Sequence, residues 1–261
     1  MPIKINNLIF LDQENLELVN EIYIKPLKIC SDISKKFLSD LSKNLFSSKD
    51  LRKYNDIASF AFWCRKSNLE KINKDYINNN FSLGRGLAFH ITPSNVPTNF
   101  AFSFGLGLLS GCSNIVRIPS VKYKQVEIIC SEIFNLLNEN KYKELSLMNK
   151  FITYKKNEKI TEHISLMSNA RLIWGGDNTI AELKKARTKP RCIDICFSNR
   201  YSFTLISSKY LNSLKLEELK IVAKKFYNDA FILNQNACSS PYLIVWIGSE
   251  ENTKKSQLLF W

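Results

Sequence analysis

The stretch GLAFHITPSNVPTNFAFSFGLGLLSGCSNIVRIP, residues 86–119, decides the fold. It opens with a β-rich apolar run at 86–92, passes through a turn with two prolines into an apolar helical run at 97–112, and ends in a second β-rich run at 114–119. A strand, a helix and a strand in so short a span are typical of a right-handed crossover between two parallel strands. The stretch therefore predicts an α/β protein.

The same alternation continues on both sides of this unit. Further strands are predicted at 150–154 and 171–174, and further helices at 124–137, 160–167 and 178–186. Upstream, residues 26–48 and 50–73 carry apolar side chains at a helical spacing. We therefore predict a helical N-terminal region over residues 1–80, followed over 81–195 by a Rossmann-like nucleotide-binding domain with a parallel sheet.

A second α/β domain is predicted to begin at residue 196. Strands at 192–197 and 201–207 follow closely on one another, and a helix at 214–229 and an apolar strand at 242–247 come next. Because little of the chain remains, we expect only the first part of this domain to be present over 196–261.

Composition limits the class of protein. Lys and Arg number 37 against 24 Asp and Glu, a formal charge of +13 that favours an anionic partner. The alternative is compositional bias, since Lys, Asn and Ile are abundant throughout the chain. No zinc-finger, KH or RRM motif is present, so nucleic-acid binding is not predicted.

The spacing of the cysteines and the length of the apolar runs indicate in which cellular compartment the protein lies. The seven cysteines are irregularly spaced, as expected for reduced thiols. Residues 1–7 lack the apolar run of a signal peptide, and the apolar run at 100–112 is too short to span a bilayer. We expect a cytoplasmic protein without a membrane span.

A rigid turn presents the first candidate catalytic residue. Asn95 stands between Pro93 and Pro97, whose rings restrict the backbone. A fixed carboxamide at the carboxyl end of a strand is suited to donate to a developing oxyanion. An asparagine that only caps the following helix is the alternative.

The second candidate lies in NQNACSSP, residues 234–241, where Cys238 is surrounded by small polar residues before an apolar strand. Such a turn leaves room for a substrate carbonyl beside the thiol, as a nucleophile requires. The other six cysteines have contexts typical of packing. A structural loop cysteine is the alternative reading of Cys238.

Two glycines mark a candidate phosphate contact. Gly175 and Gly176 follow the strand at 171–174 and precede Asp177, which can cap the next helix. Backbone amides at such a turn can approach a phosphate, although Gly-Gly turns are common elsewhere. The stretch 105–111 partly matches the dinucleotide fingerprint, but it lies in a predicted helix and indicates helix packing instead.

Metal and histidine chemistry are not predicted. His90 lies on an apolar strand and His163 on a charged helix, so we interpret them as core or surface histidines. Cys192 and Cys196 lack a second pair of ligands, which excludes a structural zinc site of the usual type.

Taken in order, these motifs resemble the aldehyde dehydrogenase superfamily, and most closely its acyl-CoA reductase branch, the LuxC-like fatty acyl reductases. The resemblance is carried by AFWCRK at 61–66, GLAFHITPSNVP at 86–97, GLLSGCSNIVR at 107–117 and QNACSSP at 235–241. It extends over about residues 50–261.

The resemblance implies an aldehyde-dehydrogenase-like α/β fold, with a Rossmann-like cofactor domain and the start of a catalytic domain. It gives Asn95 the oxyanion-hole role and Cys238 the nucleophile role. The residues that it places at the cofactor are Thr92, Pro93, Ser94, Arg117, Ser120, Gly175 and Gly176. Relatives continue well beyond this length, so the chain is expected to be truncated, with a homo-oligomer or an acyl-donor protein as possible partner.

Two departures from the superfamily pattern narrow the chemistry. The stretch that matches the usual Glu general base, residues 196–200, has no carboxylate to activate water, which favours passing the acyl group between thiols. Arg117 is followed by Ser120 and Lys122 with no carboxylate before Glu127, a pattern that favours the 2′-phosphate of NADPH. The alternative is that Arg117 merely ends a buried strand.

We therefore predict an NADPH-dependent acyl-CoA reductase that converts an acyl thioester, on CoA or on a protein, to a fatty aldehyde through a Cys238 acyl-enzyme. The alternatives are an aldehyde-oxidising dehydrogenase and a catalytically silent fragment or basic binding protein. Aldehyde formation from acyl-CoA and NADPH distinguishes the first from the others.

Overall fold

The computed structural model describes residues 8–48, 53–76, 82–233 and 235–261. Residues 1–7, on which the signal-peptide expectation rests, lie outside the described residues, as do 50–52 of the helix predicted over 50–73. The chain divides into two compact units, Met1–Ser198 and Asn199–Trp261.

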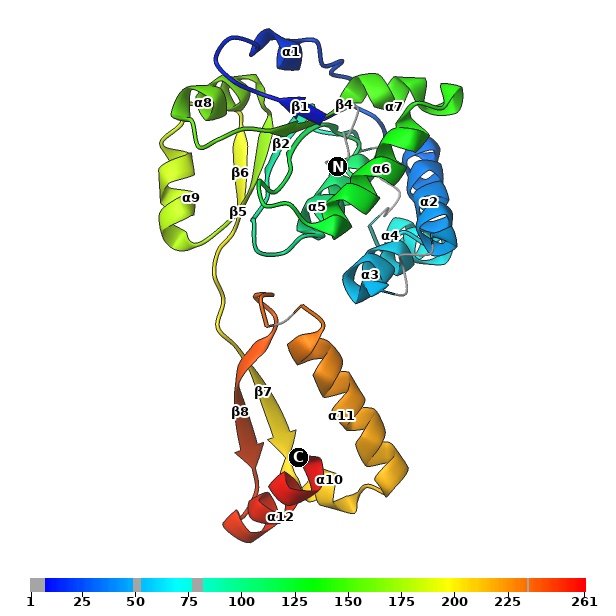
Figure 1. Ribbon diagram of the computed structural model, residues 1–261, viewed down its shortest axis with the longest axis vertical. Coiled ribbons are helices and arrows are strands. Elements are labelled where there is room, and N and C mark those ends of the chain that lie inside the picture. The colour runs from blue at the N-terminus through cyan, green and yellow to red at the C-terminus, as the bar shows by residue number, and fades with distance from the viewer. Residues whose placement is uncertain (1–7, 49–52, 77–81, 234) are drawn as a thin grey trace. The chain divides into compact units, whose positions relative to one another are not determined.

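The first unit is built on a parallel sheet, to which the described residues contribute six strands (Figure 1). The strands are β1 (Leu8–Phe10), β2 (Leu87–Ile91), β3 (Ser113–Arg117), β4 (Asn149–Thr153), β5 (Ala170–Trp174) and β6 (Ile193–Phe197). Their order is β1-β4-β3-β2-β5-β6, so the chain winds outward from β2 to one side and from β5 to the other. The predicted Rossmann-like α/β fold is confirmed.

Helices cover both faces of this sheet. One face carries α2 (Asp32–Ser47), α3 (Asn55–Trp63), α4 (Lys66–Tyr76), α5 (Asn99–Leu109), α6 (Lys124–Leu137) and α7 (Lys143–Met148). The other carries α1 (Glu17–Asn20), α8 (Glu158–Met167) and α9 (Asp177–Lys184). Alternate residues of β2 serve the two layers, since Leu87, Phe89 and Ile91 pack on the α8 side and His90 contacts α5.

The helix boundaries follow local chemistry. In α2, Phe37, Leu41 and Leu45 are buried at a spacing of four, as predicted. The helix begins later than the predicted residue 26, because Ser31 caps it by accepting from the Ser34 amide. The helix predicted over 50–73 is two helices, α3 and α4.

Some elements have no clear periodic signal. The strand β1 has three residues and pairs with β4 alone, and it lies within the N-terminal region predicted as helical. The helix α7 is also short. Elements of this length are too brief for a hydrophobic period to become visible.

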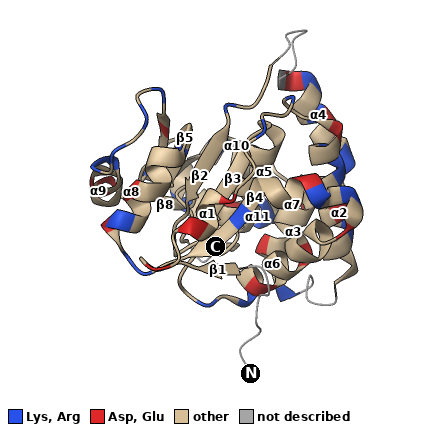
Figure 2. Ribbon diagram, turned by 90° about the horizontal axis from the view of Figure 1, so that it is seen from above, with Lys and Arg blue, Asp and Glu red and all other residues tan. Residues whose placement is uncertain are grey.

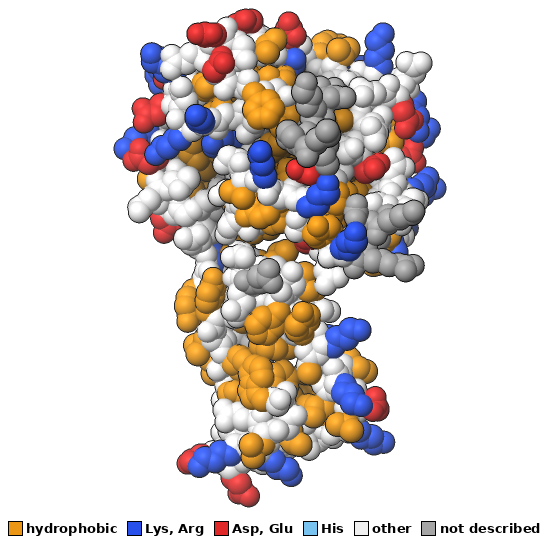
Figure 3. Space-filling model, in the orientation of Figure 1, with side chains coloured by type: hydrophobic (Ala, Val, Ile, Leu, Met, Phe, Trp, Pro, Cys, Tyr) orange, Lys and Arg blue, Asp and Glu red, His pale blue; other side chains and the backbone are white. Residues whose placement is uncertain are grey.

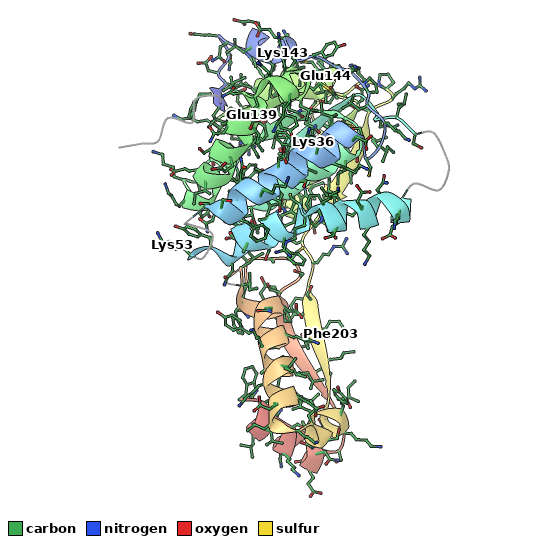
Figure 4. The ribbon with its side chains drawn as sticks, turned by 90° about the vertical axis from the view of Figure 1, so that its right-hand side faces the viewer. Lys36, Lys53, Glu139, Lys143, Glu144 and Phe203 are labelled. Atoms are coloured by element: carbon green, nitrogen blue, oxygen red, sulfur yellow. The ribbon has the colours of Figure 1, made fainter. Side chains whose placement is uncertain are left out.

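The second unit contains β7 (Ser202–Ser207), α10 (Ser208–Ser213), α11 (Leu216–Phe231), β8 (Pro241–Ile247) and α12 (Glu250–Phe260). The strands β7 and β8 are parallel, and a small core around Ile206, Leu219 and Phe260 joins them to the helices. The other face of the strands is apolar and exposed: Phe203 projects from β7 away from α11 (Figure 4), and Figure 3 shows apolar side chains gathered on this unit.

Charged residues are distributed over the first unit without separation of sign. Figure 2 shows segments with Lys and Arg interspersed with segments with Asp and Glu along the helices. Many of these cations are paired, for example Lys25 with Glu144 and Lys141 with Asp40. Among the described helices, none has the length and apolar character needed to cross a bilayer.

Candidate active site

The carboxyl ends of three neighbouring strands bring the predicted cofactor residues to one edge of the sheet. Ile91 at the end of β2 lies opposite Arg117 of β3 on one side and Ile173 of β5 on the other. The loops that begin at Thr92, after Arg117 and at Gly175 therefore leave the sheet side by side. The strand order reverses between β2 and β5, the position at which open α/β sheets bind ligands.

The loop after β2 is tied to the end of β3. The buried Thr92 hydroxyl donates to the Arg117 carbonyl at 2.6 Å. Beyond it, Pro93 is half-buried, and Ser94 and Asn95 are exposed. The N-cap position of α5 belongs to Thr98, whose side chain makes no capping hydrogen bond.

The position of Pro97 relative to the helix differs slightly from the prediction. The sequence predicts that it occupies the first turn of the helix, but α5 begins at Asn99 and Pro97 lies in the preceding turn. The Val96 carbonyl accepts from the Asn99 amide at 3.2 Å, which closes this turn against the helix. The loop that carries Asn95 is thus held at both ends, by Thr92 and by the start of α5.

Arg117 is fixed by an aromatic ring. Its guanidinium carbon lies 4.3 Å from the centroid of the Tyr154 ring, and its Nη2 donates to the Tyr154 carbonyl at 3.2 Å. Burial raises the pKa of Tyr154, although the Arg117 cation opposes the shift, so the phenol is neutral. Ser120 is exposed in the loop that follows β3.

The Gly175–Gly176 turn joins β5 to α9. The Gly175 amide donates to the Phe197 carbonyl at 3.2 Å, so this N–H serves the sheet and not a ligand. A Cβ at Gly175 would lie 3.1 Å from Thr179 Cγ2, so a larger residue would require the Thr179 side chain to shift. Gly176 is the N-cap of α9, whose first amides have no acceptor within the helix and point toward the same edge.

A chain of buried hydrogen bonds lies beneath this edge. Trp174 Nε1 donates to Ser103 Oγ at 3.3 Å, and Ser103 Oγ lies 2.8 Å from His90 Nδ1. His90 Nε2 lies 2.9 Å from Asn114 Oδ1, and Asn114 Nδ2 donates to Asn149 Oδ1 at 2.7 Å. Because the Asn114 amide nitrogen is committed as donor, its Oδ1 accepts from His90, and His90 Nδ1 accepts from Ser103.

Burial lowers the pKa of His90 to about 4, against a hydrogen bond with Asn114 that raises it, so the ring is neutral at pH 7. The interpretation of His90 as a core histidine is confirmed. The partners were not predicted, because Ser103 and Asn114 come from different elements. In the sequence, Ser103 and Asn114 stand out only as polar residues inside apolar runs.

Cys238 belongs to the second unit. It is exposed and lies in a β-turn closed by the Ser240 amide, which donates to the Ala237 carbonyl at 3.0 Å. The Ser202 hydroxyl donates to the Cys238 carbonyl at 2.7 Å and ties the turn to the start of β7. Gln235, just before the turn, has a φ of 59°, an uncommon conformation for a residue other than glycine.

Among the seven cysteines, which are all free, Cys238 alone is exposed. Cys64 and Cys130 are buried, and burial raises the pKa of both thiols, which makes their thiolates unfavourable. Cys192 and Cys196 are half-buried on or next to β6. Asn95 and Cys238, the two predicted catalytic residues, are in different units.

The carboxylate closest in sequence to residues 196–200 is already engaged. Asp194 accepts hydrogen bonds from Arg171 Nε at 2.7 Å and Nη2 at 2.6 Å. A carboxylate held in this way is a poor general base, because it would have to give up a bidentate ion pair.

A half-open cavity of about 240 Å³ lies elsewhere, near the amino end of β4, and its walls include Ile9, Phe134 and Leu147. None of the predicted site residues lines it. Within the described ranges, no three His, Cys, Asp or Glu side chains form a cluster able to hold a metal ion.

The family model of the LuxC acyl-CoA reductases matches residues 16–256. The chain belongs to this family. A search of curated protein sequences found no match to this chain.

Solved structures share the fold at low sequence identity. A proline utilization A protein from Corynebacterium freiburgense has a TM-score of 0.64 and 12% identity, over 97% of this chain and 26% of that one. A putative aldehyde dehydrogenase from Burkholderia cenocepacia has a TM-score of 0.62 and 12% identity, over 88% and 51%. Betaine aldehyde dehydrogenase from Staphylococcus aureus has a TM-score of 0.60 and 12% identity, over 87% and 48%. The LuxC-family chain spans between about a quarter and about half of the length of these proteins.

Proposed function

We propose that this protein reduces an acyl thioester, carried on CoA or on a protein, to a fatty aldehyde, with NADPH as the hydride donor. The observation that carries the proposal is the exposed thiol of Cys238 on a tight turn, in a chain of the LuxC acyl-CoA reductase family. No other cysteine combines exposure with a small polar surrounding.

The residues at the carboxyl edge of the sheet fit a dinucleotide. The first amides of α9 are suited to the pyrophosphate, and Arg117 and Ser120 are suited to the 2′-phosphate of NADPH. Thr92, Pro93 and Ser94 begin the neighbouring loop, which the Thr92 hydroxyl ties to the Arg117 carbonyl. When bound, the cofactor supplies the hydride that converts an acyl group to an aldehyde.

The chemistry assigned to the chain's own residues is acyl transfer. The Cys238 thiol loses its proton to solvent, and its sulfur forms a bond to the acyl carbonyl carbon. The C–S bond to the leaving group then breaks, and the departing thiolate takes a proton from solvent. The Asn95 carboxamide donates to the oxyanion of the tetrahedral intermediate. The acyl group then resides on Cys238 as a thioester, ready for reduction.

Two observations favour reduction over release of an acid. Residues 196–200 contain no carboxylate, and Asp194 is committed to Arg171. Without a carboxylate in this stretch to activate water, hydrolysis of the acyl-enzyme should be slow, so that the thioester persists.

We extend the proposal to organisation and location. We propose residues 81–195 as the NADP-binding domain and 196–261 as part of the catalytic domain, with a homo-oligomer or an acyl-donor protein as partner. Residues 196 and 197 nevertheless complete β6 in the sheet of the first unit. The free state of the seven cysteines supports a reducing, cytoplasmic location.

The test is aldehyde formation from acyl-CoA substrates of several chain lengths with NADPH, with Cys238→Ala as the matched control. Aldehyde from the wild type and none from the variant supports the proposal. Oxidation of aldehyde with NADP⁺ and no reduction of acyl-CoA would favour an aldehyde-oxidising dehydrogenase. If the protein shows neither acyl-CoA reduction nor aldehyde oxidation and is not acylated, it is a catalytically silent fragment or a basic binding protein.

A further inference from the structure

The ends of β3 and β4 place a cation on an aromatic ring. Arg117 is the last residue of β3 and Tyr154 directly follows β4, and the Ile118 amide donates to the Ile152 carbonyl at 3.0 Å to hold the two ends together. The Arg117 guanidinium contacts the Tyr154 ring at 4.3 Å and the Tyr154 carbonyl at 3.2 Å. Two contacts of different direction restrict both the position and the plane of the guanidinium.

Tyr154 is itself anchored. Its side chain is buried in the core that includes Ile160 of α8, and its hydroxyl lies 3.0 Å from Thr161 Oγ1. Thr161 Oγ1 donates to the Asn157 carbonyl at 3.0 Å, so the Tyr154 hydroxyl is the donor in its bond with Thr161. The ring is thereby fixed to the first turn of α8 and provides a rigid support for Arg117.

The charge of Arg117 is not neutralised by a carboxylate. In the described part of the chain, no Asp or Glu forms an ion pair with it, whereas the other strand arginine, Arg171, is paired with Asp194. Stacking uses the face of a guanidinium and leaves its edge donors for an anion. Arg117 has therefore the orientation and the uncompensated charge of an anion-binding residue at the edge where β2, β3 and β5 end.

We propose that Tyr154 is the positioning residue that gives this protein its preference for NADPH over NADH, by holding Arg117 against its ring in the plane that meets the 2′-phosphate. The inference rests on the proposed role of Arg117 in binding that phosphate. It adds a specificity-determining residue that does not itself contact the cofactor.

The experiment compares Kd values for NADPH and NADH by fluorescence titration in four proteins: wild type, Tyr154→Phe, Tyr154→Met and Arg117→Ala. Tyr154→Phe keeps the ring and leaves Thr161 bonded to Asn157, so it should retain the NADPH preference within about twofold. Tyr154→Met fills the space without a ring. It should weaken NADPH binding by roughly 3- to 10-fold, with NADH binding changed less than twofold.

The outcomes distinguish phosphate binding by Arg117 from positioning of Arg117 by Tyr154. If Arg117→Ala leaves the preference intact, the role proposed for Arg117 is wrong. If Arg117→Ala removes the preference and Tyr154→Met keeps it, Arg117 binds the phosphate but Tyr154 does not position it. A purely structural Tyr154 would weaken both cofactors equally, which also contradicts the inference. Should Tyr154→Met fail to fold, Tyr154→Leu provides the same comparison.

Discussion

Arg171 and Asp194 lie directly opposite one another on β5 and β6 and join the two strands through a bidentate ion pair. The Arg171 side chain is 2% exposed, and its Nη1 also donates to Ser165 Oγ at 3.1 Å and to the Leu183 carbonyl at 3.1 Å. The guanidinium therefore links β6 to β5, α8 and α9. This matters because β6 is the last strand of the sheet and has partly exposed apolar residues such as Ile195.

Replacing Arg171 by Met should destabilise the protein by about 2 kcal/mol, because the partly exposed Asp194 carboxylate loses its cation and Ser165 and the Leu183 carbonyl lose a buried partner. The measurement is the midpoint of urea unfolding. Arg187→Met is the matched control, since Arg187 pairs with Glu162 at the surface, and its midpoint should change little. Equal effects of the two substitutions would contradict a special role for the Arg171–Asp194 pair.

Much of the fold could be predicted from the sequence, because its strands and helices are long enough to show a period. The helix predicted at 124–137 has the same bounds as α6, and the strand predicted at 86–92 contains β2. The break between α3 and α4 was not predicted, because apolar spacing continues across it. There Asn68 Nδ2 donates to the Trp63 carbonyl, an interaction with no signature in the pattern.

The candidate site was predictable to the extent that it lies on loops at strand ends. Thr92 and Gly175 directly follow β2 and β5, Arg117 ends β3, and the parallel sheet brings these three strand ends together. The supports were not predictable, since the partners of Arg117 and His90 are distant in sequence. Tyr154 reads as an ordinary aromatic at the end of an apolar strand until its ring is seen beneath Arg117.

Stability should fall on mild acidification through His90. Burial lowers the pKa of the folded-state ring to about 4, whereas an unfolded histidine titrates near 6.5. Between about pH 6.5 and pH 4 the unfolded chain binds the proton first, so the stability present above pH 6.5 is lost as the pH falls, by about 3 kcal/mol. Denaturant unfolding of wild type and His90→Gln across this range should give curves that converge toward low pH, and parallel curves would show that His90 does not titrate as stated.

Cys238→Ala should abolish covalent acylation, because the exposed thiol in the turn closed by Ala237 and Ser240 is the assigned nucleophile. Incubation with labelled acyl-CoA followed by mass spectrometry of peptides locates the label. Cys192→Ala is the matched control and should be acylated as the wild type is. Label on another cysteine, with Cys238 unmodified, would remove the assignment.

Asn95→Ala should slow acylation by roughly 10²- to 10³-fold, the cost of losing one oxyanion donor. Because Asn95 is exposed on a loop, the thermal midpoint should remain close to that of the wild type. Single-turnover acylation rates and thermal melts of the two proteins test both statements. An unchanged rate would mean that Asn95 has no catalytic part.

Cofactor preference should depend on salt, because an ionic contact between Arg117 and a 2′-phosphate is screened in proportion to its exposure to solvent. We expect NADPH to bind more tightly than NADH at low ionic strength, with the difference shrinking at moderate salt while NADH affinity changes little.

Arg117→Ala should lower NADPH affinity about tenfold or more, as expected for a charge-assisted hydrogen bond. Lys36→Ala removes the same charge from the exposed side of α2 (Figure 4) and should leave both affinities unchanged. Equal affinities for the two cofactors, or a preference for NADH, would refute the assignment of Arg117.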